Sequence, residues 1–125
     1  ESSGLAAAHS IHNGLTALRE THAFYYGEKV AFGTLAGLHL TQAQLAEMET
    51  VYSFCEGIGL PTTFLLIGIE TIDRDQLMQV AVKACAPAEG IHHESGPITP
   101  EKVLDAMLAA DAMGRARKCS DAPGR

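Results

Sequence analysis

The chain has 125 residues, of which 46% are hydrophobic and 19% charged, and its formal net charge is -6. This length suits one domain or part of one, and the hydrophobic content is sufficient for a packed core. Fifteen acidic against nine basic residues leave no basic stripe to bind a phosphate backbone, so we expect no nucleic-acid partner.

Neither export nor membrane insertion is expected from this sequence. The apolar stretch at residues 5–8 is short and has no basic region before it, unlike a secretory signal. The longest run without a formal charge, residues 30–46, falls short of the ~20 apolar residues that cross a membrane. Cys55, Cys85 and Cys119 lie far apart without a CxxC spacing, which argues against a disulfide framework. We therefore predict a cytoplasmic protein.

Apolar periodicity and capping residues predict about five helices. The first begins after Ser2 or Ser3, and Asn13-Gly14 ends or loosens it. The second spans about residues 26–40 and is apolar on all faces, which is typical of a buried helix with close neighbours.

The third helix is expected to begin at a capping box formed by Thr41 and Gln44 and to end at Gly57 and Gly59. Its apolar residues Leu45, Met48, Tyr52 and Cys55 share one helical face. Residues 61–68 then form a short turn that Pro61 starts.

The fourth helix is capped by Asp73 and stopped by Pro87. Residues 86–97 read as a loop, and a last helix opens at Thr99 and runs to about Lys118. No strand alternation is present, so the predicted fold is all-α: an irregular bundle over residues 1–118 with a frayed tail at residues 119–125.

His9 and His12 are the first candidate site residues. Three positions apart on one helix, they lie about 60° apart around its axis and can face one pocket. Imidazole is a common metal ligand, but His12 also shares the apolar stripe of its helix and fits a core histidine equally well. No third ligand follows at a diagnostic interval.

The other candidates carry weaker signals. His92 and His93 are adjacent in a glycine-containing loop, where exposed histidines are common, and His22 has no interpretable spacing. Cys55 shares an apolar helical face, which favours packing over nucleophilic catalysis.

Several segments are similar to a known family. GLAAAHSIHNGLTAL (4–18), YGEKVAFGTLAGL (26–38), GLPTTF (59–64), ITPEKV (98–103) and LAADAMG (108–114) occur in this order in the chain. They resemble the C-terminal helical domain of the glycerol dehydrogenases, which belong to the iron-containing, or group III, alcohol dehydrogenases and share a dehydroquinate synthase-like helical domain.

The resemblance implies an enzyme in which an α/β domain, missing from this sequence, binds NAD, while the helical domain holds one divalent metal, zinc or iron. The implied ligands are an Asp upstream of this sequence, the AAAH histidine, which is His9, and a His directly before GEKV. That last position is Tyr26 here. A phenol must lose its proton to bind a metal as an anion, whereas imidazole binds neutral, so Tyr26 is a weak replacement. His22 is a possible substitute.

The implied reaction converts glycerol or a similar small polyol to a ketone by hydride transfer to NAD, and the metal polarises the substrate hydroxyl. From the helix face that it shares with His9, we add the hypothesis that His12 orients the substrate or handles a proton. Only one of the three implied metal ligands is present, and the NAD-binding domain is missing. We therefore expect this chain alone to bind neither NAD nor metal stably. The alternative is a stand-alone, non-catalytic helical module that binds a partner or forms a homo-oligomer through exposed apolar surface.

Overall fold

The computed structural model describes residues 2–16, 18, 26–86 and 98–121. These residues form five α-helices and one 3-10 helix, without a strand, so the predicted all-α fold is confirmed for the described part of the chain. The elements are α1 (Ser2–Leu15), α2 (Tyr26–Leu40), α3 (Leu45–Ile58), η2 (Leu65–Ile67), α4 (Arg74–Ala84) and α5 (Pro100–Asp121).

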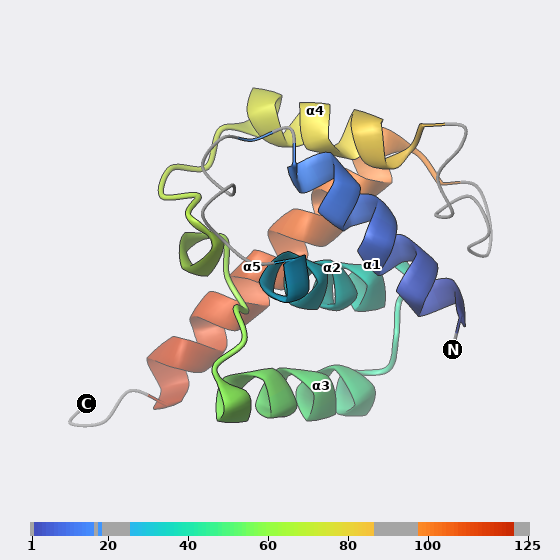
Figure 1. Cartoon of the computed structure of the whole chain (residues 1–125). Helices are drawn as coiled ribbons and strands as arrows, with labels where there is room; N and C mark the ends of the chain where they lie inside the picture. Colours follow the sequence, from blue (N-terminus) through green and yellow to red (C-terminus); the bar gives the residue numbers. More distant parts are fainter. Residues whose placement is uncertain (1, 17, 19–25, 87–97, 122–125) are drawn as a thin grey trace.

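Helix α2 is the centre of the packing, with α1, α3 and α5 against it, while α4 closes the other side by packing on α1 and α5 (Figure 1). One hydrophobic core joins these helices. Its largest fully buried side chains come from every helix and from the segment before and within η2: Ile11, Leu15, Phe32, Leu35, Tyr52, Phe64, Ile67, Leu77, Val80, Val103 and Met107.

Two helix starts and one helix end follow the predicted chemistry. The Asp73 carboxylate accepts hydrogen bonds from the backbone N–H groups of Asp75 and Gln76, which caps α4. Thr99 Oγ1 accepts from the backbone N–H of Lys102 at 3.3 Å and caps α5. Gly59 ends α3 in the left-handed region, with φ 82°, which glycine adopts without steric cost.

The predicted capping box at the start of α3 is wrong. Gln44 is the N-cap residue but makes no side-chain cap bond. The Thr41 hydroxyl instead donates to the carbonyl of Gly37 at 3.0 Å, so it belongs to the end of α2. Leu45 is 63% exposed rather than on the inner face of α3.

Helix α1 ends at Leu15, one residue past the predicted end at Asn13-Gly14. Gly14 is buried where α1 meets α4, and a Cβ at this position would overlap the carbonyl oxygen of Val80. Glycine often ends a helix, but Gly14 lies inside one and contacts α4. The sequence alone does not distinguish these two roles.

The remaining boundaries differ by a few residues. The turn predicted from Pro61 is the 3-10 helix η2, which starts four residues later at Leu65. Helix α5 continues three residues past Lys118, to Asp121. Most of the predicted loop, residues 87–97, and residues 122–125 of the predicted tail lie outside the described residues. In the described part of the chain, no helix is both long and apolar enough to span a bilayer.

Candidate functional site

The crossing of α1 and α2 places the two predicted histidines. A Cβ on Gly33 of α2 would lie 2.7 Å from the carbonyl oxygen of Ala8 on α1, so glycine lets the two backbones touch. His9 follows Ala8 directly and is exposed, while His12 lies one turn further along α1 and is half-buried. Lys29, one turn before Gly33 on α2, is buried with 7% of its surface exposed.

His12 lies in surroundings that favour its neutral form. Burial is the main cause that lowers the pKa of His12. A hydrogen bond with Asn13 opposes the shift, and the positive charges of Lys29 and His9 lower the pKa further. His12 Nδ1 lies 3.3 Å from Asn13 Oδ1. A neutral imidazole has a lone pair for a proton or a metal, so His12 is poised to accept one.

The described residues do not supply a complete metal site. No group of three or more His, Cys, Asp or Glu among them is arranged to hold a metal ion. His9 is the one predicted ligand whose side chain the structure describes. Tyr26 is the first residue of α2, but its side chain lies outside the described set, as do His22, His92 and His93. The side chains that the structure describes therefore do not form a metal centre without further donors.

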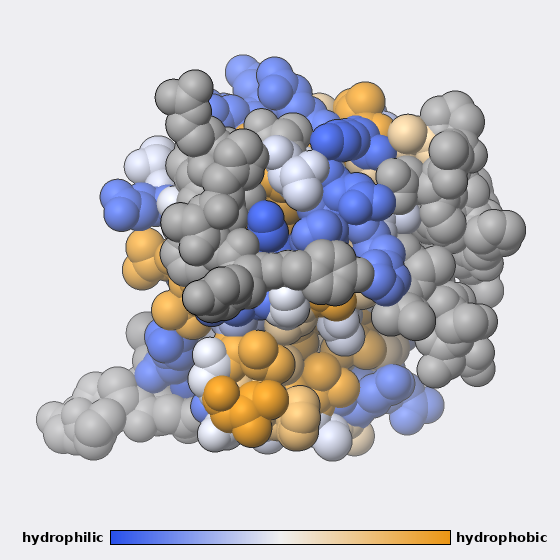
Figure 2. Space-filling model, viewed as in Figure 1, coloured by the Kyte–Doolittle hydropathy of each residue, from blue (hydrophilic) through white to orange (hydrophobic). Residues whose placement is uncertain are grey.

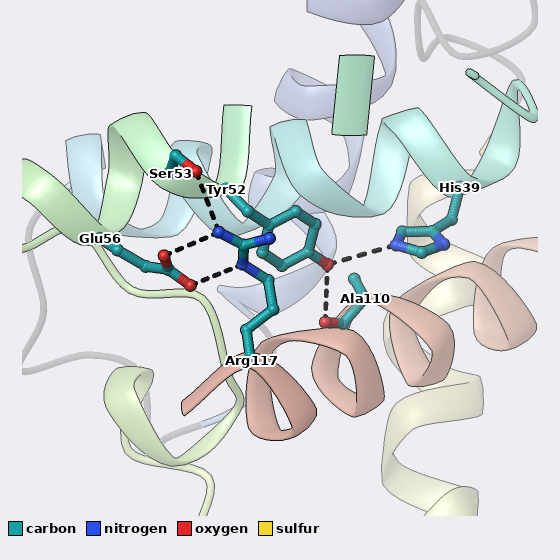
Figure 3. Close-up of polar contacts among 6 residues, drawn as sticks. All are labelled: His39, Tyr52, Ser53, Glu56, Ala110 and Arg117. Carbon is teal, nitrogen blue, oxygen red and sulfur yellow. Dashed lines mark hydrogen bonds and ion pairs between the residues drawn. The ribbon is translucent and has the colours of Figure 1, made fainter. Parts of the chain in front are cut away.

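A second polar cluster, which the sequence did not predict, surrounds Tyr52 on the inner face of α3 (Figure 3). The Tyr52 hydroxyl donates to the carbonyl oxygen of Ala110 in α5 at 2.8 Å. Because its proton is used there, the phenol oxygen accepts from His39 Nε2, 3.2 Å away in α2. The Tyr52 side chain thus connects α3 with α2 and α5. Burial raises the pKa of Tyr52 and lowers the pKa of His39.

Arg117 of α5 closes the other side of this cluster (Figure 3). Its guanidinium donates to both carboxylate oxygens of Glu56, at 2.8 and 3.0 Å, and to Ser53 Oγ at 3.0 Å. It also lies 5.6 Å from the centroid of the Tyr52 ring, within cation–π range. The hydrogen bond from Arg117 is the main cause of a lowered pKa at Glu56. This cluster attaches α3 to α5, so its role is structural.

Cys55, which lies next to this cluster, behaves as the sequence predicts. Its side chain is buried in the hydrophobic core, and burial followed by the charge of Glu56 raises the pKa of its thiol. A raised pKa keeps the sulfur as an unreactive thiol, which fits packing rather than nucleophilic chemistry.

A third polar contact holds the segment before η2 against α5. Asp111 is 2% exposed, and its Oδ1 accepts from the backbone N–H of Phe64 at 2.8 Å. Its Oδ2 accepts from Arg115 Nε at 2.8 Å. Three residues further along α5, a Cβ on Gly114 would overlap the carbonyl oxygen of Thr62. The GLPTTF and LAADAMG segments therefore pack directly against each other, which gives both a structural role.

A surface hollow of about 470 Å³ lies beside the start of α4, lined by Gly68, Glu70, Thr71, Asp73 and Gln76. It contains none of the predicted site residues. Asp73, one of the two acids that line it, already caps α4. The α1–α2 crossing remains the candidate site, because in the described part of the chain it brings the predicted residues His9 and His12 close to the buried Lys29.

Comparisons with known proteins identify the class to which this arrangement belongs. No protein-family model matches the chain. Glycerol dehydrogenase of Thermotoga maritima is 54% identical over 118 residues, covering 94% of this chain and 32% of the relative. Glycolaldehyde reductase of Halobacterium salinarum is 50% identical over 115 residues, covering 92% and 32%. The crystal structure of glycerol dehydrogenase from Schizosaccharomyces pombe superposes with a TM-score of 0.89 at 32% identity, covering 95% of this chain and 30% of that one.

The fold and the sequence together match a helical part of proteins named as dehydrogenases. More specifically, the chain is homologous to one part of the glycerol dehydrogenases, and it spans about a third of the length of the relatives it matches. The resemblance noted in the sequence is confirmed at this level.

Proposed function

We propose that this chain is the helical part of a cytoplasmic, NAD-dependent and metal-dependent polyol oxidoreductase that oxidises glycerol or a similar small diol. The observation that carries this proposal is the 54% identity to a glycerol dehydrogenase along nearly the whole chain. The two histidines at the α1–α2 crossing support it, because they form an exposed ligand next to a neutral, half-buried imidazole.

In this proposal the chain supplies part of the catalytic centre. His9 contributes one metal ligand, and the metal, when bound, acts as a Lewis acid on the substrate hydroxyl. His12 orients the substrate or accepts a proton, a role that suits its lowered pKa. The other metal ligands and the nicotinamide site belong to polypeptide outside the described residues. For this reason, the chain mixed with NAD, glycerol and Zn²⁺ should form no NADH.

A chimeric enzyme tests the proposal. The segment of Thermotoga maritima glycerol dehydrogenase that matches this chain is replaced by the chain, and glycerol oxidation is followed by NADH absorbance with added Zn²⁺. We expect metal-dependent activity that His9→Ala removes and that Tyr26→His raises by about tenfold or more, because an imidazole replaces a poor ligand. His12→Ala should lower kcat/KM by about 100-fold, the contribution of one proton-transfer group.

Gln79→Ala, an exposed position on α4, is the control and should leave kcat/KM unchanged. A folded chimera that binds NAD but stays inactive with both Tyr26 and His at this position would refute the proposal. Full kcat/KM in the His12→Ala variant would refute the role of His12 alone.

We also propose a second candidate function, which applies to the chain as an isolated molecule: a non-catalytic module that self-associates. The observation that favours it is the apolar surface over α3 in the lower part of Figure 2. Helix α3 carries three strongly exposed large side chains, Leu45 at 63%, Phe54 at 61% and Ile58 at 60%. Phe54 and Ile58 lie one turn apart on the same face of α3, and exposed apolar side chains that gather on one face are typical of contact regions.

Light scattering of the purified chain tests this candidate. We expect a dimer or larger species at high concentration and a monomer after Phe54→Ser with Ile58→Ser, since both changes remove apolar area from α3 without touching the core. The Gln79→Ala variant should associate like the unchanged chain. A clean monomer at every concentration would contradict the self-association.

A further inference from the structure

Lys29 is a buried cation at the α1–α2 crossing. It lies in the second turn of α2 with 7% of its surface exposed. Among the residues that the structure describes, no carboxylate, carbonyl or hydroxyl oxygen forms a hydrogen bond or ion pair with its ammonium group. The other buried charged residue of the described part, Asp111, has both of its oxygens occupied.

A buried ammonium group needs an acceptor, because it loses the water that would otherwise solvate its three N–H donors. The side chain of Lys29 lies close enough to His12 for its charge to contribute to the lowered pKa of His12. The Lys29 charge thus lies at the crossing where Gly33 brings α2 into backbone contact with α1.

We propose that Lys29 is the binding group of an oxyanion site at the α1–α2 crossing, which takes one small anion of the phosphate or carboxylate type from solution. The anion supplies the acceptor oxygens that the described residues lack and offsets the positive charge beside His12. The site is independent of the proposed catalytic function, because it needs neither a metal nor NAD.

Inorganic phosphate is the probe, added to the purified 125-residue chain at constant ionic strength with chloride as the balancing ion. The readouts are the ¹³Cε and ¹⁵Nζ signals of Lys29 and the thermal midpoint of unfolding. We expect a saturable shift of the Lys29 signals, and a rise in Tm of about 5 °C at a phosphate concentration of about ten times Kd, since phosphate binds the folded state.

Three variants make the test specific. Lys29→Met keeps the length and apolar stem but removes the charge, so it should fold and lose the phosphate-dependent rise in Tm. Lys29→Arg keeps a cation and should retain most of that rise. Lys83→Met, at an exposed lysine on α4, is the matched control and should respond to phosphate like the unchanged chain.

The proposal fails if phosphate produces only linear shifts, equal at Lys29 and Lys83, or if Lys29→Met retains the rise in Tm. If Lys29 binds no phosphate, the glycerol oxidation expected of the chimeric enzyme stays the same. An inactive chimera, in turn, would not change the phosphate response of the isolated chain, so the two failures are distinguishable.

Discussion

Gly114→Ala is expected to destabilise the fold by about 2 kcal/mol, because an added Cβ at Gly114 makes a closer contact than one at any other glycine that the structure describes. The new Cβ would overlap the carbonyl oxygen of Thr62 and press on Thr63. Since the obstacle is backbone rather than a rotatable side chain, α5 and the segment before η2 must separate, and overpacking of this kind costs about 1–3 kcal/mol or more. The gain of about 1 kcal/mol in helix propensity from alanine offsets only part of this.

Urea unfolding followed by circular dichroism measures this change. Gly57→Ala in α3 is the matched control, because a Cβ there meets no atom within 4 Å. That variant should be as stable as the unchanged chain or up to about 1 kcal/mol more stable. Equal stability of the two alanine variants would show that the close contact between α5 and Thr62 does not exist in solution.

Asp111→Ala is expected to cost about 3 kcal/mol of unfolding free energy. The substitution leaves the buried N–H of Phe64 without its 2.8 Å acceptor, and an unsatisfied buried donor costs about 1–3 kcal/mol. A cavity and the lost charge-assisted bond add to this. The ion pair with Arg115 contributes little, because the Arg115 side chain is 61% exposed and water screens such pairs.

The same unfolding assay separates these contributions. Asp111→Asn retains an acceptor for Phe64 N–H and should lose about 1 kcal/mol, while Arg115→Ala should lose less than that. Asp105→Ala, at an exposed position on α5, is the control and should stay within about 0.5 kcal/mol of the unchanged chain. If Asp111→Ala were as mild as this control, the bond to Phe64 would not be a stabilising contact.

The helices could be predicted because their signals are local. Apolar residues at helical spacing, a capping acid at Asp73 and a left-handed glycine at Gly59 each act within one or two turns. Where prediction failed, a contact between distant segments overrode the local rule. Gly14 lies within α1 because its missing side chain makes room for Val80 of α4, and nothing near Gly14 in the sequence indicates this.

The candidate site was predictable in part, for a similar reason. His9 and His12 belong to one helix, so their relation follows from helical geometry. The roles of Lys29 and Tyr52, in contrast, depend on how distant segments pack together. Lys29 is buried by a crossing of two helices, and the Tyr52 hydroxyl bonds to a carbonyl 58 residues later in the chain. Sequence periodicity predicts whether such residues lie on the surface or in the core, but it does not predict which distant residues they contact.

Helix α3 is attached to the rest of the molecule mainly through Tyr52, Cys55 and the Arg117 bonds, and its outer side chains face solvent. Elements with few buried contacts open at a lower free energy than the whole protein. His39 of α2 bonds to Tyr52 and is coupled to α3, whereas His9 and His12 lie on α1, which is not among the main packing partners of α3. We therefore expect that binding to α3, or local opening of α3, leaves the backbone contact between Gly33 of α2 and Ala8 of α1 intact.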